Sequence, residues 1–170
     1  QAGSEAAGLG EDMDLSFVVQ LKIDEARKKI TLLENRSRKK MAEDDYHKIE
    51  VSLNPYDWNE ARRLVQEHQQ ALTEYLGEAE RSNILRLSGF FGDIEEGDRT
   101  ARQEPESVLN LEMALTFYKH AEQKARYLAG WKDLLFITQQ KIDENLKRTA
   151  LLETGNRRLQ ADESFERIKE

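Results

Sequence analysis

The sequence predicts an all-α protein made of long helices, and three observations support this prediction. Only 9 Gly and 2 Pro occur among 170 residues, so helix-breaking residues are scarce. Charged residues make up 35% of the chain, against roughly 25% in an average domain, which favours helices with wide solvent-exposed faces. The apolar residues recur at spacings of three and four, as on one face of a helix. We therefore expect a long antiparallel three-helix bundle or coiled coil.

The first helix is expected to follow a flexible lead-in at residues 1–10, which holds three of the nine glycines. It is predicted over residues 12–53, and a helix of this length extends about 60 Å. Its apolar face comprises Leu15, Val19, Ala26, Ile30, Leu33, Met41 and Val51.

The break between the first and second helices is predicted at Asn54-Pro55-Tyr56-Asp57. Proline disfavours helical backbone at the residue before it, and the side chain of Asp57 can cap the helix that follows. The second helix is expected over residues 57–92, with a kink or break at Gly89-Phe90-Phe91-Gly92. The two phenylalanines of this segment are expected to close one end of the core.

A third helix, capped by Ser107, is expected over residues 107–130 after a polar connection at residues 93–106. Because no proline follows Pro105, this helix is predicted to extend toward residue 168, with a weak point at Gly155. The sequence leaves its continuity at Gly130 and Gly155 open. A helix of about 60 residues is too long for a compact globule, so it favours a bundle with an extension or a coiled coil.

An internal repeat links the two ends of the chain. Asp14–Glu34 has the sequence DLSFVVQLKIDEARKKITLLE, and Asp133–Glu153 has the sequence DLLFITQQKIDENLKRTALLE, at an offset of 119 residues. The two segments agree at about 12 of 21 positions, whereas roughly two matches are expected between helices of similar composition. Polar positions agree as well as apolar ones, so duplication explains the match better than a shared amphipathic pattern. Residues 11–130 are interpreted as one repeat unit, and residues 131–170 as the start of a second copy.

Two architectures are consistent with this repeat. In the first, the third helix continues into the first helix of the next unit, so that the units join into a rod. In the second, the third helix lies beside the first, as half of a duplicated hairpin. The first plan resembles that of spectrin-type repeats in architecture only, because no motif in the chain is specific to that family.

No set of residues predicts catalysis, a metal site or a bound cofactor. The chain has no Cys, which excludes disulfides, thiolate ligands and a cysteine nucleophile. His47, His68 and His120 are expected in different helices without a partner at metal-ligand spacing, which favours surface histidines. The acidic run at residues 93–98 lacks the order of a calcium-binding loop, and a solvated connection is the preferred interpretation. A helical-bundle enzyme or metal carrier is therefore disfavoured.

The candidate partner-binding surface is a dense basic patch in the first helix. The formal net charge of −7 argues against binding to nucleic acid, and no apolar run approaches the roughly 20 residues that span a bilayer. The patch could dock an acidic partner or anionic lipid head groups. Nearby acidic residues such as Glu34 and Glu43 can also pair with it as an ordinary solvated face. It consists of Lys28, Lys29, Arg36, Arg38, Lys39 and Lys40.

The expected function is a non-enzymatic structural or protein-interaction module, a helical scaffold segment of a tandem-repeat protein. Its narrow apolar stripe also leaves self-association into a dimer open. The alternative is the extracytoplasmic helical sensor or stalk domain of a bacterial membrane protein, motivated by the start at Gln1, the absence of Cys and the long helices. Cytoplasmic and extracytoplasmic locations are both compatible with the sequence.

Overall fold

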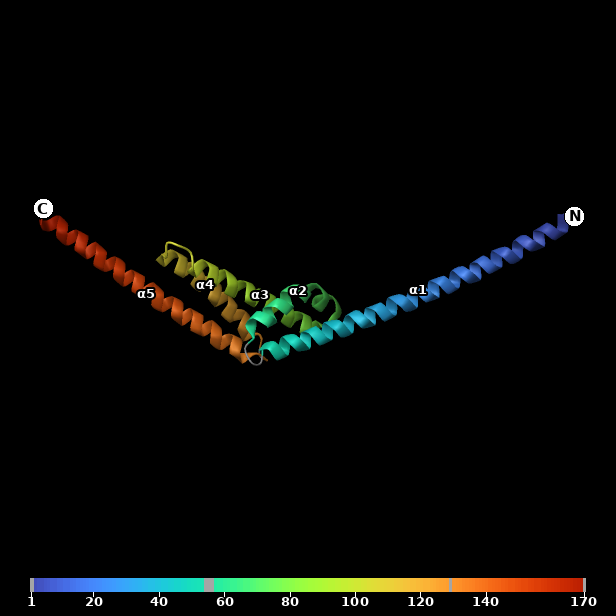
Figure 1. Cartoon of the computed structure of the whole chain (residues 1–170), viewed down its shortest axis with the longest axis horizontal. Coiled ribbons are helices and arrows are strands. Elements are labelled where there is room, and N and C mark those ends of the chain that lie inside the picture. Colours follow the sequence, from blue (N-terminus) through green and yellow to red (C-terminus); the bar gives the residue numbers. More distant parts are fainter. Residues whose placement is uncertain (1, 54–56, 129, 170) are drawn as a thin grey trace.

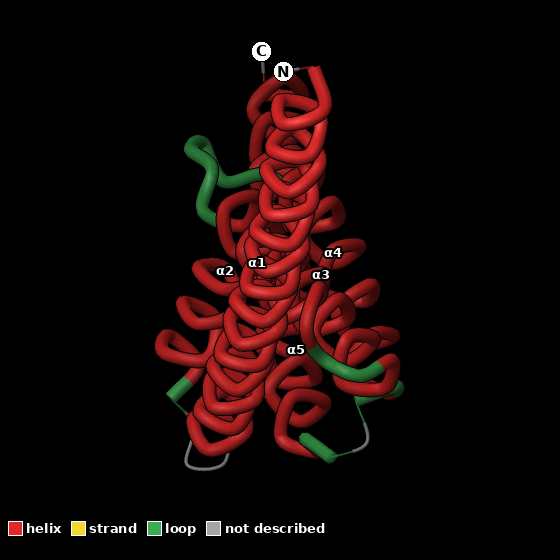
Figure 2. Tube along the Cα trace, turned by 90° about the vertical axis from the view of Figure 1, so that its right-hand side faces the viewer, coloured by secondary structure: helices red, strands yellow, loops and turns green. Residues whose placement is uncertain are grey.

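The computed structural model describes residues 2–53, 57–128 and 130–169, and in this part of the chain every regular element is a helix. Two long helices meet at one end and diverge, and three shorter helices pack in the angle between them (Figure 1). Figure 2 shows these helices joined by loops, with no strand in the part described. The prediction of an all-helical bundle is confirmed. The helices are α1 (Ala2–Leu53), α2 (Trp58–Tyr75), α3 (Glu78–Ala101), α4 (Val108–Arg126) and α5 (Lys132–Lys169).

Two helix starts follow the predicted capping chemistry. The carboxylate of Asp57 accepts a hydrogen bond of 3.1 Å from the backbone N–H of Glu60 at the start of α2. The hydroxyl of Ser107 accepts one of 3.1 Å from the backbone N–H of Asn110 at the start of α4. The predicted turn at residues 54–56 lies outside the described residues, and the flanking helices end at Leu53 and begin at Trp58.

The single second helix expected over residues 57–92 is two helices, α2 and α3. The chain leaves helical geometry at Leu76, whose backbone is extended and whose side chain is buried, and α3 begins after Gly77. Glycine is a weak helix former but is accepted at the residue before a helix, so the break falls there. The break expected at residues 89–92 is absent, because α3 runs through that segment to Ala101.

The first part of the polar connection expected at residues 93–106 is also helical, because α3 continues to Ala101. Phe90, Phe91 and Ile94 are buried on one face of α3, and this burial outweighs the low helix propensity of the glycines between them. Trp58 stacks on Phe90 with 5.7 Å between ring centroids, and Phe90 contacts Phe91 edge to face at 5.6 Å. The phenylalanines thus lie within the core and do not close its end.

The expected continuous third helix is interrupted. α4 ends at Arg126, and α5 begins at Lys132 after a turn in which the backbone N–H of Trp131 donates to the carbonyl of Leu128 at 2.9 Å. Beyond this turn α5 runs through Gly155 without a break. The chain therefore reverses between α4 and α5, and α5 packs along α4 and does not extend it (Figure 1).

The core lies around α3, which contacts both α2 and α4. The C-terminal part of α1 packs on α2, and α2 packs on α3. α3 also packs on α4, which in turn packs on α5. Representative buried residues of these helices are Ile49, Val65, Leu72, Ile84, Leu87, Leu111 and Ile142.

Both long helices extend well beyond this core (Figure 1). All described side chains from residue 15 to residue 41 of α1 are exposed, as are those from residue 153 to residue 164 of α5. The stretch expected to be a flexible lead-in, residues 1–10, is helical from Ala2 onward and belongs to α1. We call residues 15–41 the arm.

Candidate interaction surface

The arm carries an apolar face that nothing in the described chain covers. Leu15, which belongs to the apolar face predicted from the sequence, is 69% exposed, and Ile23 on the same side of the helix is 41% exposed. Exposed apolar side chains gathered on one face of a helix are typical of an interaction surface. We call the set the arm stripe; it comprises Leu15, Val19, Ile23, Ile30 and Leu33.

The second copy of the repeated segment buries the same face. Leu134 and Ile142, which correspond to Leu15 and Ile23, are only 3% and 6% exposed. Their helix, α5, packs against α4 along this face. The alanines of α4 leave room for a helix to approach closely, and three of them are buried, namely Ala114, Ala121 and Ala125. The same apolar face is therefore buried in α5 and exposed in α1.

A polar cluster flanks the covered face. The ammonium group of Lys141 lies 2.6 and 2.9 Å from the two carboxylate oxygens of Asp98, and the hydroxyl of Tyr118 donates to the same carboxylate at 2.8 Å. The Lys141 ammonium also lies 5.7 Å from the centre of the Tyr118 ring. Burial, together with the hydrogen bond to Asp98, raises the pKa of Tyr118 well above its ordinary value. The phenol therefore stays neutral and acts as a donor.

A second cation of α5, Arg148, bonds to residues at the connection between α3 and α4. The guanidinium of Arg148 donates to the Glu106 carboxylate at 2.8 Å and to the carbonyl of Ala101 at 2.9 Å. The planar guanidinium suits such simultaneous donation to two acceptors. Lys141 and Arg148 thus fix the register of α5 on the α3–α4 hairpin at two points.

The counterparts of these cations on the arm are Lys22 and Lys29. Lys22 pairs with Glu25 of its own helix at 3.1 Å, and both side chains are largely exposed. Such pairs contribute at most about 0.5 kcal/mol each. Lys22 is therefore free to change partner at little cost.

The predicted basic patch is divided by the structure. At about 100° per residue, Lys28, Lys29, Arg36, Lys39 and Lys40 fall on one side of α1, whereas Arg38 falls on the side that faces α2. Arg38 donates to the hydroxyl of Tyr75 at 3.2 Å, and this hydrogen bond raises the pKa of its guanidinium. All six side chains lie on the exposed arm.

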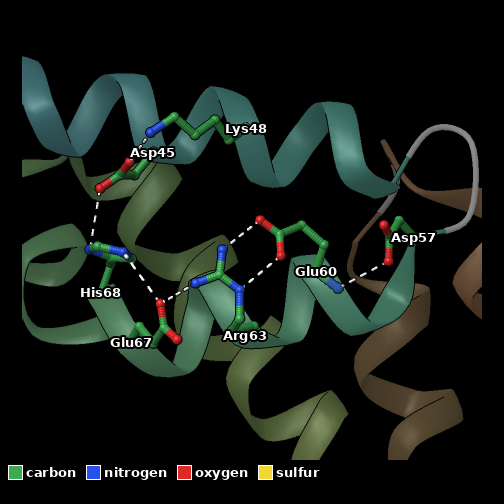
Figure 3. A network of polar contacts seen from close by, with 7 residues as sticks. All are labelled: Asp45, Lys48, Asp57, Glu60, Arg63, Glu67 and His68. Atoms are coloured by element: carbon green, nitrogen blue, oxygen red, sulfur yellow. Dashed lines mark hydrogen bonds and ion pairs between the residues drawn. The ribbon is translucent and has the colours of Figure 1, made fainter.

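The base of the arm is held to α2 by a polar network (Figure 3). Asp45 of α1 lies 2.7 Å from the ammonium of Lys48 and 3.3 Å from Nδ1 of His68. Arg63 connects Glu60, at 2.6 and 2.8 Å, with Glu67, and the Glu67 carboxylate lies 3.9 Å from His68. Arg63 lowers the pKa of the Glu60 carboxyl group. Spacing along the sequence gave no sign of the Asp45–His68 contact, because it joins two helices.

The acidic run at residues 93–98 is not a solvated loop, since its carboxylates are paired with cations from several helices. Asp93 lies 2.6 Å from Lys124 of α4, and Glu95 lies 2.5 Å from Arg62 of α2. The described residues contain no group of three or more His, Asp or Glu side chains placed to hold a metal ion. Asp93, Glu95 and Asp98 thus contact other helices, whereas Glu96 pairs with Arg99 within α3.

A polar cavity of about 100 Å³ lies beside the Lys141 pair, between α3, α4 and α5. Asp98, Tyr118 and Arg148 line it together with Asn145. Asn145 is buried, and its two amide atoms make no hydrogen bond to any residue that the structure describes. A buried amide without a hydrogen bond destabilises a fold by about 1–3 kcal/mol.

Comparison of the chain with protein-family models, with curated proteins and with solved structures gave no match. Among the described residues, no helix combines the length and the apolar character that crossing a membrane requires.

Proposed function

We propose that this protein is a non-enzymatic structural module, a segment of a helical rod built from repeated units. One observation carries the proposal. The repeated helix occurs twice, in α1 and in α5, and each copy buries only the half that packs against a neighbouring helix. The first half is bare in α1 and covered in α5. The second half is buried on one face in α1, whereas its counterpart in α5 is exposed from residue 153 to residue 164.

The reversal holds at individual positions of the second half as well. Ala42 of α1 is buried at 2% exposure near α2, whereas its counterpart Ala161 in α5 is exposed. Such a helix suits a chain of tandem units, because the helices of one unit can pack on the half of the helix that is exposed in its neighbour. In such an array, long helices fix the distance between the parts attached at their ends, and the exposed charged faces remain available to protein partners.

Small-angle scattering with an absolute mass measurement, over a concentration series, tests this proposal. We expect an elongated particle, because α1 alone is about 78 Å long at 1.5 Å per residue. A compact particle with a radius of gyration near 15 Å, the globular value for this length, would contradict the proposal.

A tandem chain gives a sharper version of the same test. Joining residues 1–132 directly to residues 14–170 keeps the repeat in register, because residue 14 corresponds to residue 133. We expect the maximum dimension to increase with the added unit while the cross-section stays constant. A second unit that folds back on the first, with little increase in length, would exclude a rod.

A further inference from the structure

We propose that the arm stripe is the binding face for the α3–α4 hairpin of a preceding copy of this repeat unit, joined in tandem. The inference rests on the proposed function and names the occupant of the exposed face. In this arrangement the first half of α1 packs on the α3–α4 hairpin of the preceding unit, as the first half of α5 packs on the α3–α4 hairpin of this unit. The helix itself then connects the two units.

The apolar positions of the arm match those that α5 buries on the hairpin. Three leucine or isoleucine residues that α5 packs on the core have the same residue at their counterparts on the arm. The matching pairs are Leu134 and Leu15, Ile142 and Ile23, and Leu152 and Leu33. A face of the same shape can therefore enter the same groove between helices.

The substitutions between the two copies do not weaken this fit. Thr138 is buried, but its hydroxyl donates to the carbonyl of Leu134 in its own helix at 2.7 Å, so Val19 loses no bond to the hairpin. Ala26 stands where α5 has Asn145, and it removes the unpaired amide. Both changes make the arm more apolar than the segment that is already bound.

Charge complementarity points to the same occupant. Lys22 corresponds to Lys141, the partner of Asp98, and Lys29 corresponds to Arg148, the partner of Glu106. An α3–α4 hairpin of the same kind presents these two carboxylates at matching positions. Lysine lacks the fork of arginine, so the contact of Lys29 with Glu106 should be the weaker of the two.

The tandem chain described above allows a direct test, because the natural chain has no Cys and a single introduced thiol reports on its own surroundings. With Ile23→Cys in the second unit, we expect thiol labelling at least about tenfold slower than with Ile23→Cys in the first unit, whose arm has no preceding hairpin. Gln20→Cys in the second unit is the matched control, because its counterpart Gln139 is exposed in α5 and should stay rapidly labelled.

Charge exchange tests the register of the contact. Asp98→Lys in the first unit should speed the labelling of the second unit's Ile23→Cys thiol, and adding Lys22→Asp in the second unit should restore slow labelling. A loss of folding caused by Asp98→Lys alone would not be rescued in this way. Rescue therefore separates a specific pairing of Lys22 with Asp98 from general destabilisation.

The outcomes distinguish this inference from the proposed function. Rapid labelling of the second unit's Ile23→Cys thiol in a tandem chain that scatters as an elongated particle would overturn the inference and leave the rod intact. Labelling of Ile23→Cys in the single chain that slows as protein concentration rises would also overturn it, because the arms would then bind each other. A compact tandem chain would overturn the proposed function itself.

Discussion

Leu134 and Ile142 of α5 are almost fully buried, whereas Leu15 and Ile23, at the same positions of the repeated segment in α1, are exposed. The two segments share most of their residues, and both are helical. What differs is the neighbour: α5 lies against α4, and the arm projects from the bundle. An amphipathic pattern therefore indicates that a helix has a face to bury, but it does not indicate where the covering helix comes from.

The largest expected effect is the contrast between Ile142→Ala and Ile23→Ala. Truncating buried Ile142 should lower the free energy of unfolding by about 2–5 kcal/mol, because it removes apolar contact and leaves a cavity. Ile23→Ala should change it by less than about 0.5 kcal/mol in the single chain. Urea denaturation followed by fluorescence of Trp58 and Trp131 measures both. Equal losses would mean that the arm is covered in solution.

A substitution at Gly97 should disturb the polar cluster beside the buried face of α5. A Cβ atom at this position would lie 2.5 Å from the ring of Tyr118, which holds Asp98 in place for Lys141. We expect Gly97→Ala to lower the free energy of unfolding by about 1–3 kcal/mol. In the control Gly92→Ala, the new methyl meets no atom within 4 Å, so a gain of up to about 1 kcal/mol is expected. Thermal unfolding followed by circular dichroism compares the two variants.

The pH dependence of stability reports on the same cluster. Because the pKa of Tyr118 is raised in the folded state, its neutral form is favoured there, and stability should fall as pH rises above the ordinary tyrosine pKa of about 10. Tyr118→Phe should lower the free energy of unfolding by about 1 kcal/mol at neutral pH, through loss of the hydrogen bond to Asp98.

The difference between the natural chain and Tyr118→Phe should then shrink between neutral pH and about pH 11, because the variant has no phenol to ionise. Urea denaturation at several pH values measures this. Lys141 and Arg148 also face the cluster, and both the natural chain and the variant retain them. A difference that stays constant with pH would show that the ionisation of Tyr118 is not linked to folding.

The smallest effect is expected at Asn145. Asn145→Ala gives α5 the residue that the arm has at position 26 and removes two buried polar atoms without partners. The loss of packing and the removal of the unpaired amide oppose each other, so the free energy of unfolding should change by less than about 1 kcal/mol. Ala26→Asn, on the exposed arm, is the matched control and should have no measurable effect. A loss above about 2 kcal/mol for Asn145→Ala would indicate that the amide is hydrogen-bonded in solution.

Local chemistry predicted part of this fold well. The caps at Asp57 and Ser107 depend on residues within one turn, and the structure has both. The continuity of α3 through its glycines was not predictable in this way, because it depends on contacts such as that of Phe90 with Trp58, which lie far apart in the sequence. Propensity alone favoured a break there.

The candidate surface shows the same limit. Its apolar and basic residues could be found from spacing, and the repeat indicated which residues of α5 to compare with them. The pairing of Lys141 with Asp98 joins residues 43 positions apart, and nothing in the spacing of either residue indicates it. Likewise, the chain reverses between the end of α4 and the start of α5, and the sequence did not indicate this reversal because no proline marks it.

The main helix interfaces of this protein join α1 to α2, α2 to α3, α3 to α4 and α4 to α5, each helix to the next one in the chain. Contacts between consecutive segments close only short loops, and chains rich in such contacts fold quickly. Each helix can therefore find its neighbour soon after synthesis, without waiting for a distant part of the chain. Lengthening the protein by whole units would add more interfaces of the same kind and would not slow the folding of those already made.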